Sequence, residues 1–144
     1  MKNELSIPLT SANRSEQKPR TSIRSAALWV VQVLLALLFL FAGGMKLMMP
    51  IQVLLAQMAV PLPGLFVRFI GVIEVAGALG LTFPALLRIK PFLTPLAACG
   101  LVIEMIGATA ITVISMGAAP ALMPLVVGLL AAFVAYSRRN LLAV

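Results

Sequence analysis

The chain has 144 residues, of which 62% are hydrophobic and 10% are charged, a composition that excludes a disordered chain and argues against a soluble globular domain. The net charge of +7 does not indicate nucleic-acid binding, because the basic residues flank long apolar runs instead of forming a patch among aromatic side chains. Histidine is absent and Cys99 is the only cysteine, which excludes a Cys/His metal site, a CxxC redox pair and a histidine-based catalytic dyad.

Residues 1–25 form a polar, basic tail without hydrophobic periodicity, which predicts a partly disordered cytoplasmic segment. The first membrane-spanning helix is predicted over residues 26–48, interrupted only by Gln32 and Lys46. A basic tail before an apolar run also resembles a cleavable signal peptide. This run is longer than the apolar region of a signal peptide and three further spans follow, so we expect an uncleaved first span.

A mostly apolar connection of residues 49–63, bracketed by prolines, follows the first span. Its composition favours an interfacial or re-entrant segment over a solvated loop. The second span is predicted from residue 64 to residue 83 or 87. The turn that follows it contains two prolines and two basic residues, namely Pro84, Arg88, Lys90 and Pro91.

The third span is predicted over residues 92–116 and the fourth over residues 121–136, with a short turn between them. Residues 138–144 then form a short cytoplasmic C-terminus. A span needs about 20 residues, so four spans and a tail nearly fill the chain. Residues 26–137 therefore predict a single domain, an all-α integral membrane bundle of four antiparallel helices.

The basic residues predict the orientation of this bundle. If every span crosses the membrane, most of the 11 lysines and arginines fall on the side that holds both termini. Trp29 and Tyr136 fall at the same predicted interface, where aromatic residues form belts. The positive-inside rule then places the N- and C-termini in the cytoplasm.

Two glutamates, Glu74 and Glu104, lie near the centres of the second and third predicted spans. A charge at the centre of a bilayer costs about 2.5–3.5 kcal/mol on insertion scales, so such residues normally face the bundle interior and have a partner or a role. Each glutamate stands in a VIExxGA pattern, at residues 72–78 and 102–108, which indicates either an internal repeat or a chance similarity of apolar segments. Because consecutive spans are antiparallel, the two carboxyls can meet near mid-membrane.

Two cations, Lys46 and Arg68, are predicted near the outer ends of the first and second spans. The side chain of Lys46 either bends inward to a carboxylate or extends outward to lipid head groups, and both interpretations stay open. Arg68 is on a different face of its helix from Glu74, so we favour an interfacial anchor over a direct ion pair. Together with Glu104, these residues are the candidates for a polar centre inside the membrane.

Small residues beside these charges predict close helix packing, because membrane helices associate where their backbones can approach each other. The candidate packing residues are Gly43, Gly71, Gly77 and Gly107. Glu74 and Glu104 are therefore expected to project from packed faces and not from lipid-facing ones.

Two segments carry a family resemblance: FAGGMKL at residues 41–47 and IGVIEVAGALGL at residues 70–81. With them, residues 26–137 resemble the DoxX-like family of small four-span bacterial membrane proteins. The resemblance implies a four-helix bundle, usually in the bacterial inner membrane. Some relatives are associated with membrane redox chemistry, including a subunit of thiosulfate:quinone oxidoreductase. The family's lysine corresponds to Lys46, and its glutamate in the second span corresponds to Glu74.

The chain departs from the family pattern at two places in the third span. Glu104 stands where many relatives are expected to be apolar. Ile111-Thr112-Val113 stands where some relatives carry a histidine. The missing histidine argues against carrying over a metal or proton-relay role.

The leading functional prediction is therefore an accessory role in a membrane redox or quinone-linked process. No self-contained catalytic centre is evident, so whether the protein is an enzyme stays open. No cofactor is evident from the residues, although a quinone is possible. The expected partners are membrane lipid and either a redox partner or a second copy of the chain. Two alternatives stay open, a small proton-coupled transporter with Glu74 and Glu104 in its pathway, and a structural or assembly subunit.

Overall fold

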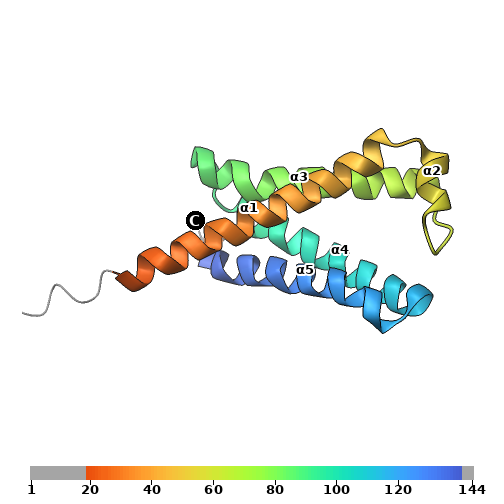
Figure 1. Cartoon of the computed structure of the whole chain (residues 1–144). Coiled ribbons are helices and arrows are strands. Elements are labelled where there is room, and N and C mark those ends of the chain that lie inside the picture. The colour runs from red at the N-terminus through yellow and green to blue at the C-terminus, as the bar shows by residue number, and fades with distance from the viewer. Residues whose placement is uncertain (1–18, 141–144) are drawn as a thin grey trace, which may run out of the picture.

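The computed structural model describes residues 19–140, most of which lie in helices (Figure 1). The helices are α1 (Pro19–Met48), α2 (Ile51–Ala56), α3 (Gly64–Leu87), α4 (Leu93–Met116) and α5 (Ala118–Ser137). Four of them are long and apolar enough to cross a membrane, over residues 23–48, 64–87, 93–116 and 118–137. The described residues contain no strand, so the prediction of an all-α protein with four membrane-spanning helices is confirmed.

The four long helices form two antiparallel pairs, α1 with α3 and α4 with α5 (Figure 1). Contacts between α3 and α4, and a smaller set between α1 and α5, join the two pairs. The start of α1, the α3–α4 turn and the end of α5 lie at one end of the bundle, which we call the terminal end. α2 and the α4–α5 turn lie at the opposite end, the α2 end, toward which the two pairs diverge.

The apolar core lies between the middle of the bundle and the terminal end. Its side chains recur three or four residues apart on each helix, because this spacing keeps them on one helix face. The buried members include Phe39 on α1, Leu81 on α3, Leu101 on α4 and Val134 on α5. Many other large apolar side chains are exposed, as expected of helices whose outer faces contact lipid.

The second span ends at Leu87, the later of its two predicted ends, so Pro84 lies inside α3 and its predicted place in the following turn is wrong. Proline lacks an N–H group, so the carbonyl of Gly80 loses its helical donor, a loss that membrane helices tolerate where neighbouring elements surround the site. Pro84 is buried, and the side-chain amide of Gln32 on α1 donates a hydrogen bond to the nearby carbonyl of Leu81. α3 therefore continues to Leu87.

The N-terminal boundary of α1 also differs from the prediction. The helix begins at Pro19, so residues 19–25, predicted as part of the tail, are helical. Proline suits the first position of a helix, because the N–H group that it lacks has no partner there. The rest of the predicted tail, residues 1–18, and residues 141–144 of the predicted C-terminus lie outside the described residues.

Two short connections lie at the α2 end. Residues 49–63 contain α2, whose 6 residues include no buried side chain. At about 1.5 Å per residue, a helix of this length is too short to cross a bilayer. The α4–α5 connection is Gly117 alone, where residues 117–120 were predicted. Its φ of 94° lies in the region that glycine adopts without a steric penalty, so the chain reverses within one residue.

Candidate functional site

An ion pair joins the end of α1 to the middle of α3. The Nζ atom of Lys46 lies 2.6 Å from Oε1 and 2.7 Å from Oε2 of Glu74, so the ammonium donates hydrogen bonds to both carboxylate oxygens. The Glu74 side chain is 4% exposed and that of Lys46 is 22% exposed. Side chains of a helix lean toward its N-terminus. Lys46 lies in the last turn of α1, so its stem leans back into the bundle and not outward to head groups.

Two glycines bring the two helices close enough for this ion pair. A Cβ atom added to Gly43 would lie 2.7 Å from the carbonyl oxygen of Gly71, and one added to Gly71 would lie 2.9 Å from the Cβ of Lys46. Side chains at these positions would therefore push α1 away from α3. Gly77, one turn beyond Glu74, makes the matching approach to α4, where an added Cβ would lie 2.7 Å from Leu101.

Arg68 on α3 binds the end of α1 and not a carboxylate. Its guanidinium donates hydrogen bonds to the carbonyl oxygens of Lys46 and, at 2.7 Å, of Met49. The last carbonyls of a helix lack helical donors, and the residue that would serve Lys46 is Pro50, which has no N–H group. Arg68 thus caps α1 from the neighbouring helix, and it fixes the backbone of the residue that carries the ammonium.

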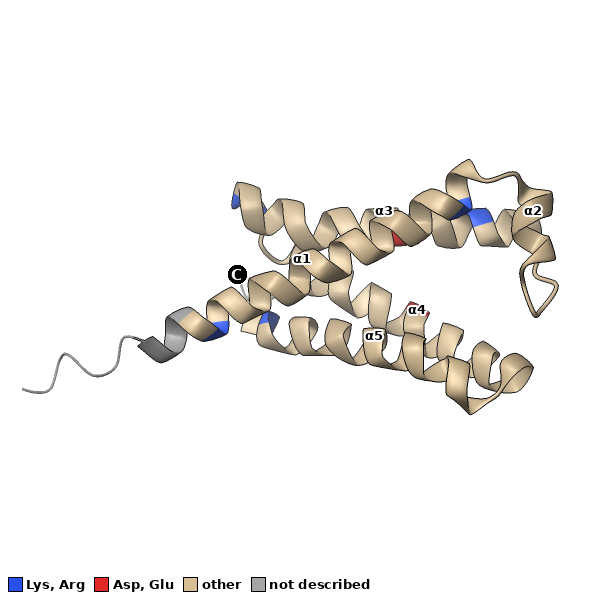
Figure 2. Cartoon of the chain, viewed as in Figure 1, with Lys and Arg blue, Asp and Glu red and all other residues tan. Residues whose placement is uncertain are grey.

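A cavity of about 500 Å³ opens between α3 and α4 where the two helix pairs diverge. Its polar lining consists of Lys46, Glu74, Glu104 and Thr112. Apolar side chains supply the rest of the wall, with Met58 and Leu62 of the α2–α3 connection near the α2 end. Figure 2 shows that the two acids lie in the middle of α3 and α4, while the cation near the end of α1 and the one near the start of α3 lie nearer to α2.

Glu104 contributes an oxygen without a partner to this polar lining. Its Oε2 atom is buried and has no hydrogen-bond partner among residues 19–140. The carboxyl lies within electrostatic range of both Glu74 and Lys46. A buried carboxyl oxygen without a partner is costly, because burial removes its water without a replacement donor. Thr112 does not supply that donor, because its hydroxyl donates to the carbonyl of Ala108 at 2.7 Å.

Gly107 does not have the packing role that was predicted for it. A Cβ added at this position, or at Gly100 two turns earlier in α4, would meet no atom within 4 Å. Both glycines line the cavity instead. Their missing side chains therefore widen the space beside Glu104 and do not bring helices together.

Several lining residues were not among the predicted site residues. Phe66, Phe69 and Met58 read as ordinary membrane-facing residues in the sequence, and only the divergence of the helix pairs brings them to one cavity. For Thr112, the sequence indicated only that it stands near the position at which some relatives carry a histidine. The sequence feature that indicated this region was the position of Glu74 and Glu104 near the centres of two apolar spans.

The arrangement offers both a donor and an acceptor to a ligand in an apolar cavity. An ammonium has three N–H groups, and Glu74 accepts two of those of Lys46. The third N–H of Lys46 and the free oxygen of Glu104 remain. The cavity can therefore hold a molecule that has an apolar body and a polar group able both to accept and to donate hydrogen bonds.

Comparison with known proteins places these residues within a family. No curated protein and no solved structure matches the chain. The model of the DoxX-like family matches residues 30–134, a segment that contains Lys46, Arg68, Glu74 and Glu104. This match covers most of the chain and supports the resemblance seen in the two sequence segments. The chain belongs to the DoxX-like family.

Proposed function

We propose that the cavity between α3 and α4 binds a quinone, and that the protein is an accessory subunit in a quinone-linked redox process. The observation that carries this proposal is the buried Oε2 of Glu104, which has no partner among the described residues and lies in the cavity that Lys46 also lines. A quinone carbonyl accepts hydrogen bonds, and the hydroxyl of its reduced form donates them. Lys46 and Glu104 match these two demands.

The walls of the cavity fit the rest of such a ligand. Ligand pockets commonly measure about 300–1,000 Å³ and are mainly apolar with a few placed polar groups. Here Phe66, Phe69 and Ile73 line the cavity together with the polar residues. A bound quinone would supply the redox chemistry, while the side chains of this chain bind and orient it.

The charges support an inner-membrane protein with its terminal end in the cytoplasm. Among residues 23–140, whose side chains the structure describes, the cations at the terminal end are Arg24, Arg88, Lys90, Arg138 and Arg139. At the α2 end, Lys46 is paired with Glu74 and Arg68 is bonded to carbonyls of α1. The free positive charge is therefore concentrated at the terminal end, which the positive-inside rule assigns to the cytoplasm.

Quinone binding can be measured directly on the purified full chain. The protein is extracted in mild detergent, co-purified quinone is quantified by chromatography, and a short-chain ubiquinone is titrated by calorimetry. Losing a hydrogen bond to a charged group costs about 1.5–3 kcal/mol, so we expect Glu104→Met to weaken binding about tenfold or more. Cys99→Met is the matched control, because Cys99 is exposed on the same helix and does not line the cavity.

Equal affinity in the wild type, Glu104→Met and Cys99→Met would contradict a quinone site at Glu104. A pull-down in the same detergent tests the accessory role, because a redox partner should be retained with the protein. If Lys46→Met and Glu74→Gln leave quinone binding unchanged and alter only assembly, the polar residues serve helix packing and the protein is a structural subunit.

A proton-coupled transporter is the second candidate, favoured by the balance of charges in the cavity. One ammonium and two carboxyls line it, so the cavity is electrically neutral when one carboxyl carries a proton. Such carboxyls are typical of proton pathways in membrane proteins. Proton flux into liposomes that Glu104→Gln abolishes, without quinone binding in the detergent assay, would favour this function over the first.

A further inference from the structure

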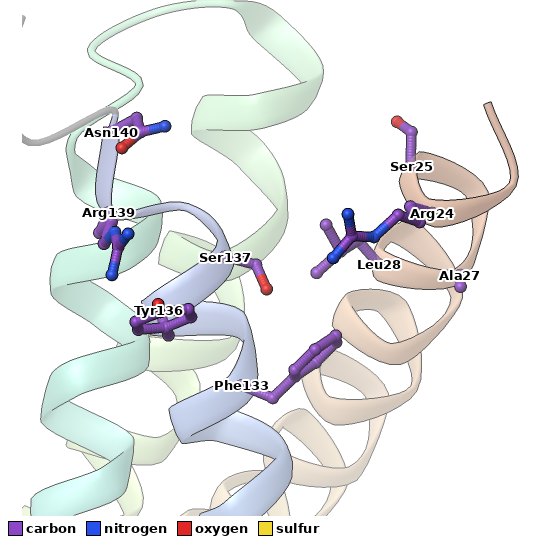
Figure 3. Close-up of a pocket in the computed structure, with 9 residues that line it drawn as sticks. All are labelled: Arg24, Ser25, Ala27, Leu28, Phe133, Tyr136, Ser137, Arg139 and Asn140. Carbon is purple, nitrogen blue, oxygen red and sulfur yellow. The ribbon is translucent and has the colours of Figure 1, made fainter. Parts of the chain in front are cut away.

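A second pocket lies at the terminal end, between the first described turns of α1 and the last turn of α5 (Figure 3). Its volume is about 610 Å³. The lining residues are Arg24, Ser25, Ala27, Leu28, Phe133, Tyr136, Ser137, Arg139 and Asn140. It shares no residue with the α3–α4 cavity and lies at the other end of the bundle, so its role is separate from quinone binding.

The polar part of this pocket is basic. Arg24 reaches from α1 toward α5, and Ser137 and Phe133 point toward it from α5 (Figure 3). Arg139 flanks the pocket on the far side of α5, where its guanidinium lies 4.0 Å from the centre of the Tyr136 ring. Neither arginine forms an ion pair within residues 19–140, because the acids in that range are Glu74 and Glu104 in the other cavity.

A third guanidinium adds to the positive charge between α1 and α5. Arg138 lies 5.9 Å from the ring of Trp29 on α1. Its Nε and Nη2 atoms are buried and have no hydrogen-bond partner among the described residues. Residues 23–140, whose side chains the structure describes, place no carboxylate beside these three arginines, which therefore repel one another. An anion bound in the pocket, which Arg138 itself does not line, would offset this repulsion.

The apolar part of the pocket indicates what kind of anion it takes. Ala27 and Leu28 of α1 and the exposed ring of Phe133 on α5 line it below the arginines. These side chains belong to helix segments that span the membrane. Trp29 and Tyr136 mark the depth at which aromatic residues meet lipid head groups. The ligand is thus amphipathic, with its charge at the head-group level and its chains in the bilayer.

We propose that this pocket binds the phosphate of an anionic phospholipid. The guanidinium of Arg24 can bind phosphate through paired hydrogen bonds, and the hydroxyl of Ser137, which faces it from α5, can donate to a further phosphate oxygen (Figure 3). Basic pockets between transmembrane helices on the cytoplasmic side hold such head groups in membrane proteins. The acyl chains then lie along Phe133 and Leu28.

Native mass spectrometry of the full chain in detergent tests the proposal, with dioleoyl phosphatidylglycerol, dioleoyl phosphatidylcholine and glycerol 1-phosphate as probes. We expect phosphatidylglycerol to bind about tenfold more tightly than phosphatidylcholine. The double variant Arg24→Gln/Arg139→Gln should abolish this preference. Arg24→Lys should lower it only in part, because lysine keeps the charge without the paired donors.

The control variant is Arg88→Gln/Lys90→Gln, which removes the same charge from the same end of the bundle but outside the pocket. It should leave the preference for phosphatidylglycerol within about twofold of the wild type, because exposed basic residues act only through the diffuse surface potential. An equal loss in both double variants would overturn the proposal in favour of general electrostatic attraction. Displacement of the lipid by glycerol 1-phosphate at similar concentration would show a site for free phosphate esters and would overturn it too.

Discussion

The ammonium of Lys46 lies 2.6 Å and 2.7 Å from the two carboxylate oxygens of Glu74, so a residue in the last turn of α1 is fixed to the middle of α3. This contact is made deep in the bundle, because the lysine stem leans toward the start of its own helix. Gly43 and Gly71 supply the space for it, and Arg68 holds the backbone from which it starts. These five residues act as one packing unit.

Removing one partner of this ion pair should destabilise the protein more than removing both. Lys46→Met leaves the buried carboxylate of Glu74 without its cation, a change that typically costs about 3–5 kcal/mol. The double variant Lys46→Met/Glu74→Met buries no unpaired charge and should recover most of that loss. Unfolding by a denaturing detergent, followed by circular dichroism, measures each variant. Additive effects of the two single changes would show that the residues do not stabilise each other.

The two adjacent glycines of α1 should respond to alanine in opposite directions. Gly43→Ala puts a Cβ atom 2.7 Å from the backbone oxygen of Gly71, which cannot move without separating the helices. We expect a loss of about 1–3 kcal/mol. Gly44→Ala meets no atom within 4 Å, so it should gain up to about 1 kcal/mol from helix propensity. Thermal unfolding in detergent distinguishes the two, and equal effects would contradict the close approach of α1 and α3.

The cap that Arg68 provides should depend on the proline that makes it necessary. Arg68→Gln leaves carbonyls at the end of α1 without a donor and should cost about 1–3 kcal/mol. Pro50→Ala restores the N–H group that the carbonyl of Lys46 lacks, so it should reduce the effect of Arg68→Gln. A double-mutant cycle measured by unfolding gives the coupling between the two positions. If Pro50→Ala has the same effect with and without Arg68, the two positions are independent and this account of the cap is wrong.

Filling the cavity from Gly107 should weaken ligand binding while leaving the fold intact. The position faces open space, so Gly107→Leu places a side chain in the cavity without displacing a helix. We expect the affinity for a short-chain ubiquinone to fall at least about tenfold, with an unfolding midpoint at or above that of the wild type. Cys99→Leu, on the exposed face of the same helix, should leave the affinity unchanged. Unaltered binding in Gly107→Leu would place the ligand elsewhere.

The positions of the long helices could be predicted from the sequence because apolar runs of about 20 residues leave few alternatives. Pro84 was predicted to lie in a turn because a proline usually marks a helix end, yet it is buried inside α3, which continues to Leu87. The pairing of Lys46 with Glu74 could be predicted from the sequence only in part. The sequence placed both residues inside the membrane, but the direction of the lysine stem depends on which helix lies beside α1.

Other features of the site depend on distances that no single segment encodes. The divergence of the two helix pairs places Gly107 in open space, although its sequence context matches that of Gly77, which is tightly packed. The role of Arg68 required the knowledge that the end of α1 lies beside the start of α3. A small residue in the sequence is therefore compatible either with close packing against another helix or with a cavity wall. Which of the two applies depends on how the helices pack in the complete bundle.

The two cations at the α2 end are both engaged inside the bundle, whereas the exposed cations Arg24, Arg88, Lys90 and Arg139 lie at the terminal end. In an energised bacterial cell the cytoplasm is the electrically negative compartment, and moving one charge through the full voltage is worth about 2.3 kcal/mol per 100 mV. With the terminal end in the cytoplasm, as proposed above, the electric field across the membrane resists any inversion that would carry this end outward. The Lys46–Glu74 ion pair, which packs α1 against α3, also neutralises a positive charge near the α2 end. It thereby increases the difference in charge between the two ends of the bundle, which favours one orientation in the membrane.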